Sequence, residues 1–272
     1  MPSKFRQRRA LTRLLLCTLF AINFVDFSSA ISVSISPFFI EKVVKAGSTV
    51  TDTISYTNRG PEAASVSVEI SDFDVGETGE VGEQPAGTKP TSLAPYIRIR
   101  PGSLTVAANQ QVYFRYSVRT PQEFKQLRAM IFFVSTPQVP EGANQILIAP
   151  RMGIPLYVEN IDAGRAKLEV QDLRWERSPE KLDFLLLKLV VTNEGERNLR
   201  PTGFLEVDSS DGNFHKIFPF NEGQEPVFPS YQRKWNLRFG PVPQNELAIK
   251  LRFATSATTT YESKAVIPAV DR

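Results

Sequence analysis

The sequence has very little of the chemistry that enzymes and metalloproteins use. Its 272 residues include one cysteine, Cys17, and one histidine, His215. A zinc site needs several such ligands, and nucleophilic catalysis needs a nucleophile beside a base. The chain also lacks a G-x-S-x-G elbow, an H-E-x-x-H motif and a Gly-rich phosphate loop. We therefore expect no catalytic residue, no metal site and no cofactor.

Residues 1–30 have the composition of an export signal. Basic residues between Lys4 and Arg13 precede an apolar run over 14–25, and the small residues Ser28 and Ala30 follow. The run is shorter than the roughly 20 residues that span a bilayer. This pattern predicts a secretory signal peptide cleaved after Ala30. An uncleaved anchor is the alternative, although Asp26 ends the apolar run early.

The signal peptide also carries the excess positive charge of the chain. Five of the 32 basic residues and one of the 29 acidic residues lie within 1–30, which leaves 27 basic and 28 acidic residues in the mature chain. A net charge of −1 gives no support for a nucleic-acid partner. No second apolar run approaches membrane length, so we expect no membrane insertion after signal cleavage.

Residues 31–160 alternate between apolar and polar side chains in short runs that end at turn residues. Such period-two runs include 49–60, 63–75, 110–121 and 130–140. The spacing predicts about seven strands of an immunoglobulin-like sandwich. The segment from Gly76 to Pro90 is too polar to bury, and its composition indicates a flexible loop.

Residues 165–272 repeat this pattern after a short linker around Asn160. They again predict about seven strands, and Trp175 and Trp235 are expected to fill the core. A single β-barrel would not explain the pause between the halves. The predicted fold class is therefore all-β, with two immunoglobulin-like β-sandwich domains in tandem, at 31–160 and 165–272, after the signal peptide.

Two acidic clusters and the histidine have both a functional and a structural interpretation. The run 208–213 offers oxygen ligands to calcium, but its Asp-Gly pair is typical of a hairpin turn, which we favour. Asp72 and Asp74 have the spacing of an acid–base pair on one strand face, although a solvated face is the favoured reading. His215 is expected to be a solvated or packed side chain.

The chain resembles the periplasmic chaperones of pilus assembly, the PapD-like family. The resemblance lies in APYIRIRPGSLTVAANQQVYFRYSVRTP (94–121), in LRAMIFFVSTPQVPEGANQILIAPRMGIPLYVEN (127–160) and, in the second half, in VFPSYQRKWNLRF (227–239). It implies two sandwich domains and a chaperone that completes a pilus subunit by strand addition. It also implies a periplasmic location, with a pilus or surface-fibre subunit and an outer-membrane usher as partners.

The strand that matches the donor strand of this family is Gln145 to Tyr157. The resemblance implies that Ile146, Ile148 and Pro150 bind the partner, since side chains two residues apart share one face of a strand. An ordinary strand that faces its own core is the alternative.

The sequence departs from the family at its carboxylate anchor. The family uses an Arg and a Lys, and the aligned positions here are Ile40 and Pro155, neither of which donates a hydrogen bond to a carboxylate. Arg115 matches the strand Arg of the family, but no acidic partner is evident near Arg128. Replacement cations are available at Arg98, Arg100 and Arg151.

These observations favour a non-enzymatic chaperone that binds exported subunits by edge-strand pairing. The alternative is an immunoglobulin-like structural component of an envelope or surface assembly, which the missing anchor favours. An enzyme that uses Asp72 or Asp74 is the third hypothesis.

Overall fold

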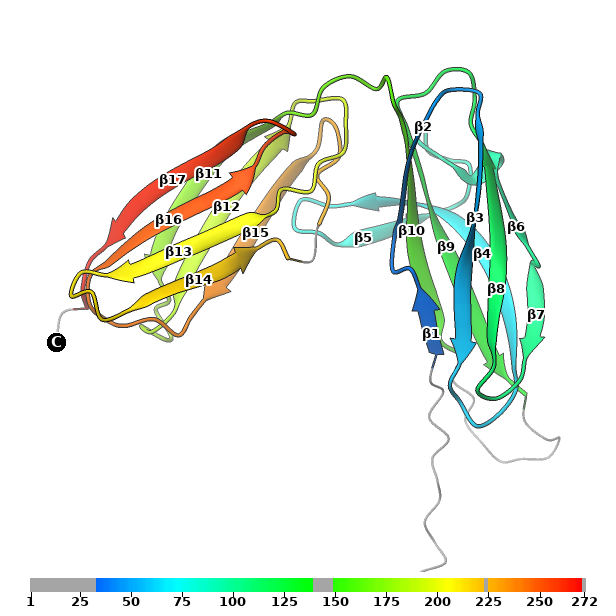
Figure 1. Cartoon of the computed structure of the whole chain (residues 1–272), viewed down its shortest axis with the longest axis horizontal. Helices are drawn as coiled ribbons and strands as arrows, with labels where there is room; N and C mark the ends of the chain where they lie inside the picture. Colours follow the sequence, from blue (N-terminus) through cyan, green and yellow to red (C-terminus); the bar gives the residue numbers. More distant parts are fainter. Residues whose placement is uncertain (1–32, 139–148, 223–224, 271–272) are drawn as a thin grey trace, which may run out of the picture.

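The computed structural model describes residues 33–138, 149–222 and 225–270, and the chain forms two β-sandwiches (Figure 1). The predicted signal peptide lies outside the described residues. The first sandwich consists of β1 (Val33–Ser36), β2 (Ile40–Val44), β3 (Thr49–Asn58), β4 (Ala64–Val75), β5 (Val81–Gln84), the short 3-10 helix η1 (Ala94–Tyr96), β6 (Ile97–Arg100), β7 (Ser103–Val106), β8 (Gln111–Arg119), β9 (Gln126–Pro137) and β10 (Arg151–Asn160). The second consists of β11 (Leu168–Arg177), β12 (Leu185–Asn193), β13 (Gly203–Ser209), β14 (His215–Phe220), β15 (Gln232–Phe239), β16 (Leu247–Ala254) and β17 (Thr260–Ile267).

The first sandwich packs one sheet of order β1-β3-β8-β6 against a sheet of order β2-β10-β9-β4-β5, on which β7 also pairs with β4. The alternation in the sequence places one face of each strand in the core between the sheets. Tyr56 and Phe114 come from one sheet and Phe133 from the other, and their rings meet edge to face or tilted. The predicted sandwich is thereby confirmed for this half.

The chain changes sheets between β1 and β2. Ser36 at the end of β1 pairs with β3, whereas β2 pairs in parallel with β10, starting at Ile40 opposite Leu156. One short segment of chain therefore covers an edge of each sheet in turn. As a result β2 reaches only the second half of β10.

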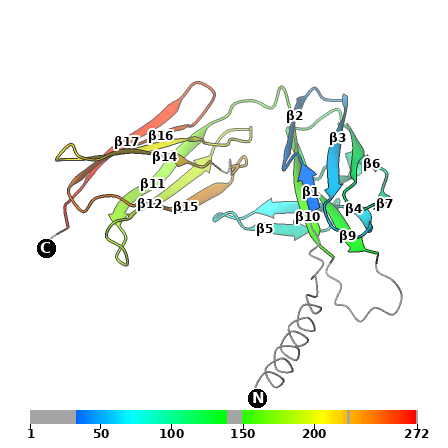
Figure 2. The same ribbon diagram turned by 60° about the horizontal axis from the view of Figure 1, so that its bottom comes forward.

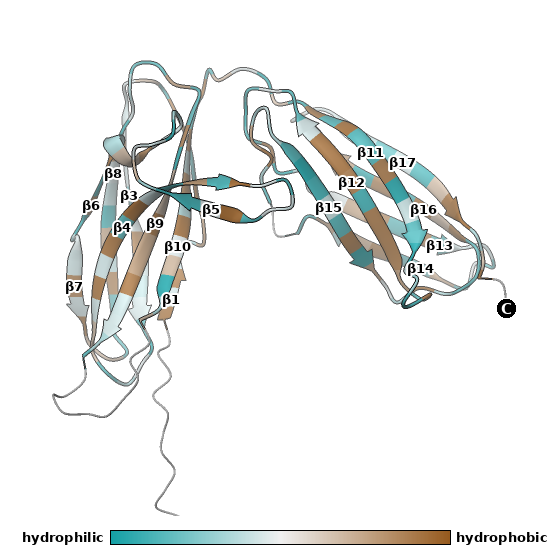
Figure 3. Ribbon diagram, turned by 180° about the vertical axis from the view of Figure 1, so that it is seen from behind, coloured by the Kyte–Doolittle hydropathy of each residue, from teal (hydrophilic) through white to brown (hydrophobic). Residues whose placement is uncertain are grey.

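The second sandwich packs a sheet of order β11-β12-β15 against one of order β14-β13-β16-β17. The central β12 is mostly apolar and appears mainly brown, whereas β15 at the edge is mostly polar and appears mainly teal (Figure 3). Trp235 is buried in the core as predicted. Trp175 is half-buried and packs against this core, with its ring centroid 6.4 Å from that of Phe239. The fold is thus all-β with two immunoglobulin-like sandwiches in tandem; the limits 31–160 and 165–272 stay a prediction.

The expectation of a flexible loop from Gly76 to Pro90 is wrong for residues 81–84. Residues 81–84 form β5, which pairs with the end of β4 from Asp72 opposite Gln84 to Val75 opposite Val81. All four residues of β5 are exposed, including the apolar Val81, because strand pairing does not require burial. The hairpin β4–β5 projects from the first sandwich toward the second (Figure 2).

In the part of the chain that the structure describes, no helix has the length and apolar character to cross a membrane.

Candidate partner-binding edge

One edge of β10 is open along the first half of the strand. On one side β10 pairs with β9 from Arg151 to Glu159, and on the other it pairs with β2 only from Leu156 to Asn160. Among the described residues, Arg151 to Pro155 therefore have no strand on their second side (Figure 1). An unpaired strand edge presents backbone groups that another chain can extend.

The hydrogen bonds at both ends of β10 fix which backbone groups face outward. The N–H of Ser135 donates to the carbonyl of Pro150 (3.0 Å), and the N–H of Asn160 donates to the carbonyl of Lys125 (2.9 Å). Even-numbered residues of β10 therefore bond toward β9, and the odd-numbered Arg151 and Gly153 point their backbone groups to the open edge.

Pro155 is the next outward position, and it has no N–H to donate. A proline inside a sheet is tolerated where its nitrogen faces an unpaired edge, which explains how Pro155 fits within a long strand. Gly153 is therefore the last residue of the open edge that offers a backbone N–H, shortly before β2 begins to pair with β10 at Leu156.

The three predicted binding residues are only partly described. Ile146 and Ile148 lie outside the described residues. Pro150 is half-buried and precedes β10, which begins at Arg151 rather than at Gln145 within the described part of the chain. Their role in partner binding stays a prediction.

Arg151 is held by carboxylates of the neighbouring strands. Its guanidinium carbon lies 3.3 Å from the ring centroid of Phe132, and its nitrogens bond to Glu69 (3.1 Å) and Glu83 (2.6 Å). The hydrogen bonds to Glu83 raise the pKa of Arg151, although burial opposes them. The side chain considered as a replacement cation therefore ties β10 to the hairpin β4–β5.

Gly153 keeps the sheet face beside the open edge flat. A Cβ at this position would lie 2.8 Å from a ring carbon of Phe132 and 3.0 Å from the sulfur of Met130. Any side chain would have to push these groups aside, so a glycine fits the close approach.

The positions aligned with the family anchor carry no cation. Ile40 is buried in the core and Pro155 is half-buried. The positive charge beside them comes from the second sandwich instead. Arg200 lies 4.7 Å from the ring centroid of Phe39 and 5.1 Å from that of Tyr157, and its Nε is 2.7 Å from Glu41. The other predicted cations, Arg98 and Arg100, lie on β6 of the opposite sheet, as does Arg115 on β8.

One exposed aromatic side chain lies next to the open edge. Phe38 occupies the bend between β1 and β2, and 84% of its surface is exposed. Since Ile40 is opposite Leu156, Phe38 stands near the point where the open part of β10 ends. It offers apolar area to a strand bound there.

The acidic partner of Arg128, which the sequence did not reveal, is Asp74. The two side chains are 2.8 Å apart, and Lys89 also pairs with Asp74. Burial raises the pKa of Asp74, but the hydrogen bonds from Lys89, Arg128 and Tyr231 outweigh it and lower the pKa. Tyr231 belongs to the second sandwich, so this network joins the two halves.

Aromatic packing surrounds the same network. Phe73, Val75, Met130 and Tyr157 of the first sandwich form a buried cluster with Phe228 of the second. The two sandwiches therefore share a small core of their own next to β10.

Asp72 and Asp74 do not lie on a solvated face, so that expectation is wrong. Asp72 is buried and accepts hydrogen bonds from Ser92 (2.5 Å) and from the backbone of Thr88 (2.8 Å) and Lys89 (2.9 Å). Both carboxylates thus have structural partners.

The run 208–213 forms the turn of the hairpin β13–β14, as favoured over the calcium loop. Asp208 pairs with His215, and Gly212 has the positive φ of 71° that such turns require. His215 is exposed, and its Nδ1 lies 2.7 Å from Asp208. Glu206, Asp208 and His215 bring three possible metal-ligand atoms within 4.8 Å of one another, but Glu206 also lies 3.7 Å from Lys250.

No protein-family profile and no curated protein matches this sequence. Solved structures similar to the chain include the class 5 fimbrial chaperone CfaA, with 10% identity over 89% of this chain and 100% of that chain and a TM-score of 0.44. A chain of the CsuC–CsuE chaperone–tip subunit complex from archaic Csu pili of Acinetobacter baumannii has 11% identity over 88% and 100%, with a TM-score of 0.45. A chain of the Salmonella enterica SafA pilin–SafB chaperone complex has 15% identity over 88% and 98%, with a TM-score of 0.44. The matches concern the fold and carry no residue's role over to this chain.

Proposed function

We propose that this chain is a periplasmic, non-enzymatic chaperone that binds an exported pilus or surface-fibre subunit by β-strand addition at β10. The supporting observation is the open edge of β10, where Arg151 and Gly153 direct backbone donors and acceptors outward. Strand addition uses such groups for affinity and alternate side chains for specificity. An outer-membrane usher would receive the bound subunit.

The side chains proposed to enter the subunit are Ile146, Ile148 and Pro150. Because side chains alternate along a strand, an extension of β10 at its N-terminal end places them on the same side as Met152 and Ile154. Met152 and Ile154 pack on the core of the first sandwich. A subunit that lacks a strand would receive this apolar row as a continuation of that core.

A structural component without a chaperone cycle is the second candidate. The observations that favour it are the buried Ile40 and the donorless Pro155, which leave the family anchor positions without a cation. In that case the chain would contact its assembly permanently rather than deliver a subunit.

A pull-down from periplasmic extract with the mature protein tests the proposal. The wild type should retain an exported β-sheet subunit, identified by mass spectrometry, and the variant with Ile146→Asp and Ile148→Asp should lose it. Ile217→Asp is the control, because it adds the same charge at a 56% exposed position on β14. Equal recovery of the subunit by both variants would contradict strand donation. Stable recovery of envelope components by every variant would support the structural alternative.

A further inference from the structure

The second sandwich has an open strand edge of its own at β15. In the sheet order β11-β12-β15 this strand is outermost. The N–H of Lys234 points away from β12 and donates to the carbonyl of Glu77 in the turn of the β4–β5 hairpin (2.6 Å). By the alternation of a strand, the backbone groups of Asn236 and Arg238 face the same way. Neither has a further backbone partner among the described residues. The hydrogen bond from Lys234 to Glu77 is therefore the only backbone hydrogen bond on this edge of β15 within the described residues.

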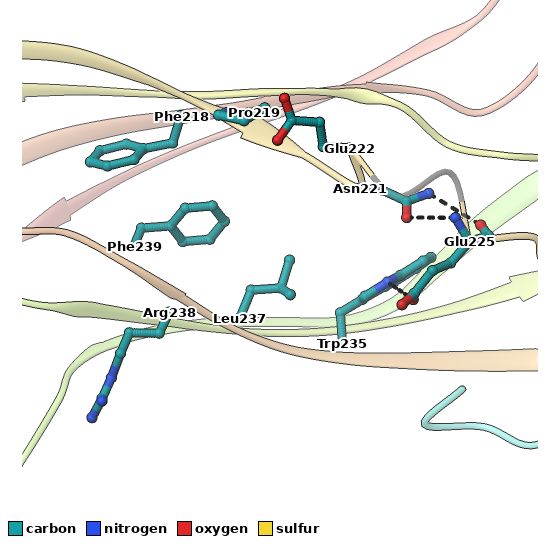
Figure 4. A pocket seen from close by; sticks show the side chains of 9 residues that line it. All are labelled: Phe218, Pro219, Asn221, Glu222, Glu225, Trp235, Leu237, Arg238 and Phe239. Carbon is teal, nitrogen blue, oxygen red and sulfur yellow. Dashed lines mark hydrogen bonds between the residues drawn. The ribbon is translucent and has the colours of Figure 1, made fainter. Parts of the chain in front are cut away.

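A groove runs beside this edge, between β15 and β14 of the facing sheet (Figure 4). Its volume is about 380 Å³, and its floor is apolar: Phe218 of β14 faces Phe239 of β15, with Leu237 and Trp235 following along β15. Leu237 is half-buried. A strand added to β15 would point every second side chain into this groove.

The opposite edge, on β14, is less able to bind a strand. The N–H of Ser209 donates to the carbonyl of Phe214 (2.9 Å), so the odd-numbered residues of β14 face outward. Pro219 is one of them and has no N–H. Backbone pairing is therefore directed to β15, and β14 supplies the apolar wall.

The groove end beside the hairpin carries an excess of negative charge. Glu225 lies there, together with Glu77 and Glu80 of the hairpin turn, and Glu222 lines the groove beside Pro219 at the end of β14 (Figure 4). The basic residues Arg233 and Lys234 pair with Glu225 and Glu77. Glu222 is exposed and makes no hydrogen bond or ion pair within the described residues. A lysine or arginine at this end of a bound strand would complement it.

The hairpin β4–β5 connects this groove to the open edge of β10. Glu83 of β5 bonds to Arg151 at the edge of β10, and Glu77 in the hairpin turn bonds to Lys234 at the edge of β15. In two views β5 lies between the first sandwich and β15 (Figures 1 and 2). Both edges are therefore tied to the same hairpin, so a partner bound at one edge lies beside the hairpin that leads to the other.

We propose that β15 and its groove bind a second, extended segment of the same exported subunit that β10 binds. This segment has apolar side chains at alternate positions and a basic residue at the end next to Glu222. The identity of the partner rests on the proposed function, whereas the binding of an extended strand at β15 does not. The chaperone would then hold its subunit at two edges.

A synthetic peptide tests the site on the full mature protein. The probe is a fluorescein-labelled nonapeptide with valine at alternate positions, threonine between them and a lysine at each end. Hydrogen exchange read by NMR should slow at the amides of Asn236 and Arg238 when the peptide binds. A peptide with serine in place of valine should give no protection.

Three substitutions separate the groove from the rest of the surface. Leu237→Glu places a charge in the apolar groove and should weaken peptide binding about tenfold or more. Glu222→Lys leaves the fold's core untouched and should weaken it about threefold to tenfold, less so at high salt. Ile217→Glu, on the exposed outer face of β14, should bind as the wild type does.

The outcomes distinguish this site from the β10 site. The variant with Ile146→Asp and Ile148→Asp should keep the protection at β15, even if it loses the subunit in the pull-down. Protection at β15 together with unaltered subunit capture by that variant would overturn only the proposed function. Absence of protection at Asn236 and Arg238 would overturn the β15 site. Binding of the peptide by Leu237→Glu and Glu222→Lys as tight as that of the wild type would overturn it too. Protection that rises with protein concentration without peptide, together with a dimer mass, would overturn it in favour of a second copy of the chain.

Discussion

The guanidinium carbon of Arg128 lies 4.3 Å from the ring centroid of Phe228, and this contact joins β9 of the first sandwich to the turn before β15 in the second. The same guanidinium bonds to Asp74 and to the hydroxyl of Tyr231. A cation stacked on an aromatic ring in a buried place contributes both charge and packing. The side chains of Arg128 and Arg233 are only 5% and 4% exposed, so both are buried at the interface.

Arg128→Met should destabilise the protein and loosen the interface. Methionine keeps the apolar contact with Phe228 but removes the most buried of the three partners of Asp74, which costs about 1–3 kcal/mol. For a chain of this size that lowers Tm by roughly 2–4 °C per kcal/mol. Thermal unfolding followed by circular dichroism measures the shift, and small-angle scattering measures the broader spread of interdomain angles. Arg98→Met is the control, because within the described residues Arg98 bonds only to nearby backbone carbonyls. A Tm equal to that of the wild type would contradict the role of Arg128.

The interface should weaken in acid because of Asp74. Burial raises the pKa of Asp74, but hydrogen bonds from Lys89, Arg128 and Tyr231 lower it below its ordinary value. A carboxylate with a lowered pKa stabilises the fold above its unfolded pKa, about 3.9, and this stability is lost as the pH falls through the folded pKa. Tm measured from pH 7 down to about pH 3 should therefore fall less steeply for Asp74→Asn than for the wild type. Asp162→Asn, at an exposed position between the sandwiches, should follow the wild-type curve.

Gly153 and Gly82 should respond differently to alanine, although both lie in the same sheet. A Cβ at Gly153 meets Phe132 and Met130 at 3.0 Å or less, whereas a Cβ at Gly82 meets no atom within 4 Å. Gly153→Ala should cost about 1–3 kcal/mol of unfolding free energy through this overpacking. Gly82→Ala should stay within about 0.5 kcal/mol of the wild type. Urea unfolding compares the two, and equal stability would show that the face beside the β10 edge has room to spare.

His215 should titrate above its ordinary pKa. The hydrogen bond with Asp208 raises the pKa of His215, burial opposes this slightly, and Glu206 adds a smaller attraction. The chain has a single histidine, so one imidazole signal in a proton NMR titration of untagged protein reports it directly. Asp208→Asn should return the pKa toward about 6.5, and Glu206→Gln should lower it by less. A wild-type value at or below 6.5 would mean that the pair is not formed in solution.

The strands and the core were largely predictable from the sequence, because both depend on local alternation. The run that begins at Met130 reads as a strand, and its odd positions Ile131 and Phe133 enter the core as their spacing indicates. The hairpin turn before His215 was also predictable, since Asp-Gly supplies the backbone angles locally.

The interface and the open edges were not predictable in the same way. Arg128 and Asp74 are 54 positions apart and meet because β9 pairs with β4. Tyr231 is 103 positions from Arg128 and reaches this pair only where the two sandwiches pack. The sequence does not predict β5 because its four residues, VGEQ, show no alternation of apolar and polar side chains. Its pairing with β4 depends on backbone groups that every sequence has. The part of the β10 edge that stays open depends likewise on where β2 begins to pair, at Leu156. The sequence of β10 itself does not contain this information.

Pro155 also restricts the register of a strand that pairs with β10. A strand laid along β10 finds its last outward donor at Gly153, and β2 occupies the edge from Leu156 onward. A strand added to β10 therefore cannot extend its pairing beyond Gly153, which restricts its register. Since a shift of one residue would turn every apolar side chain of the added strand to the opposite face, this restriction determines which of its faces is buried.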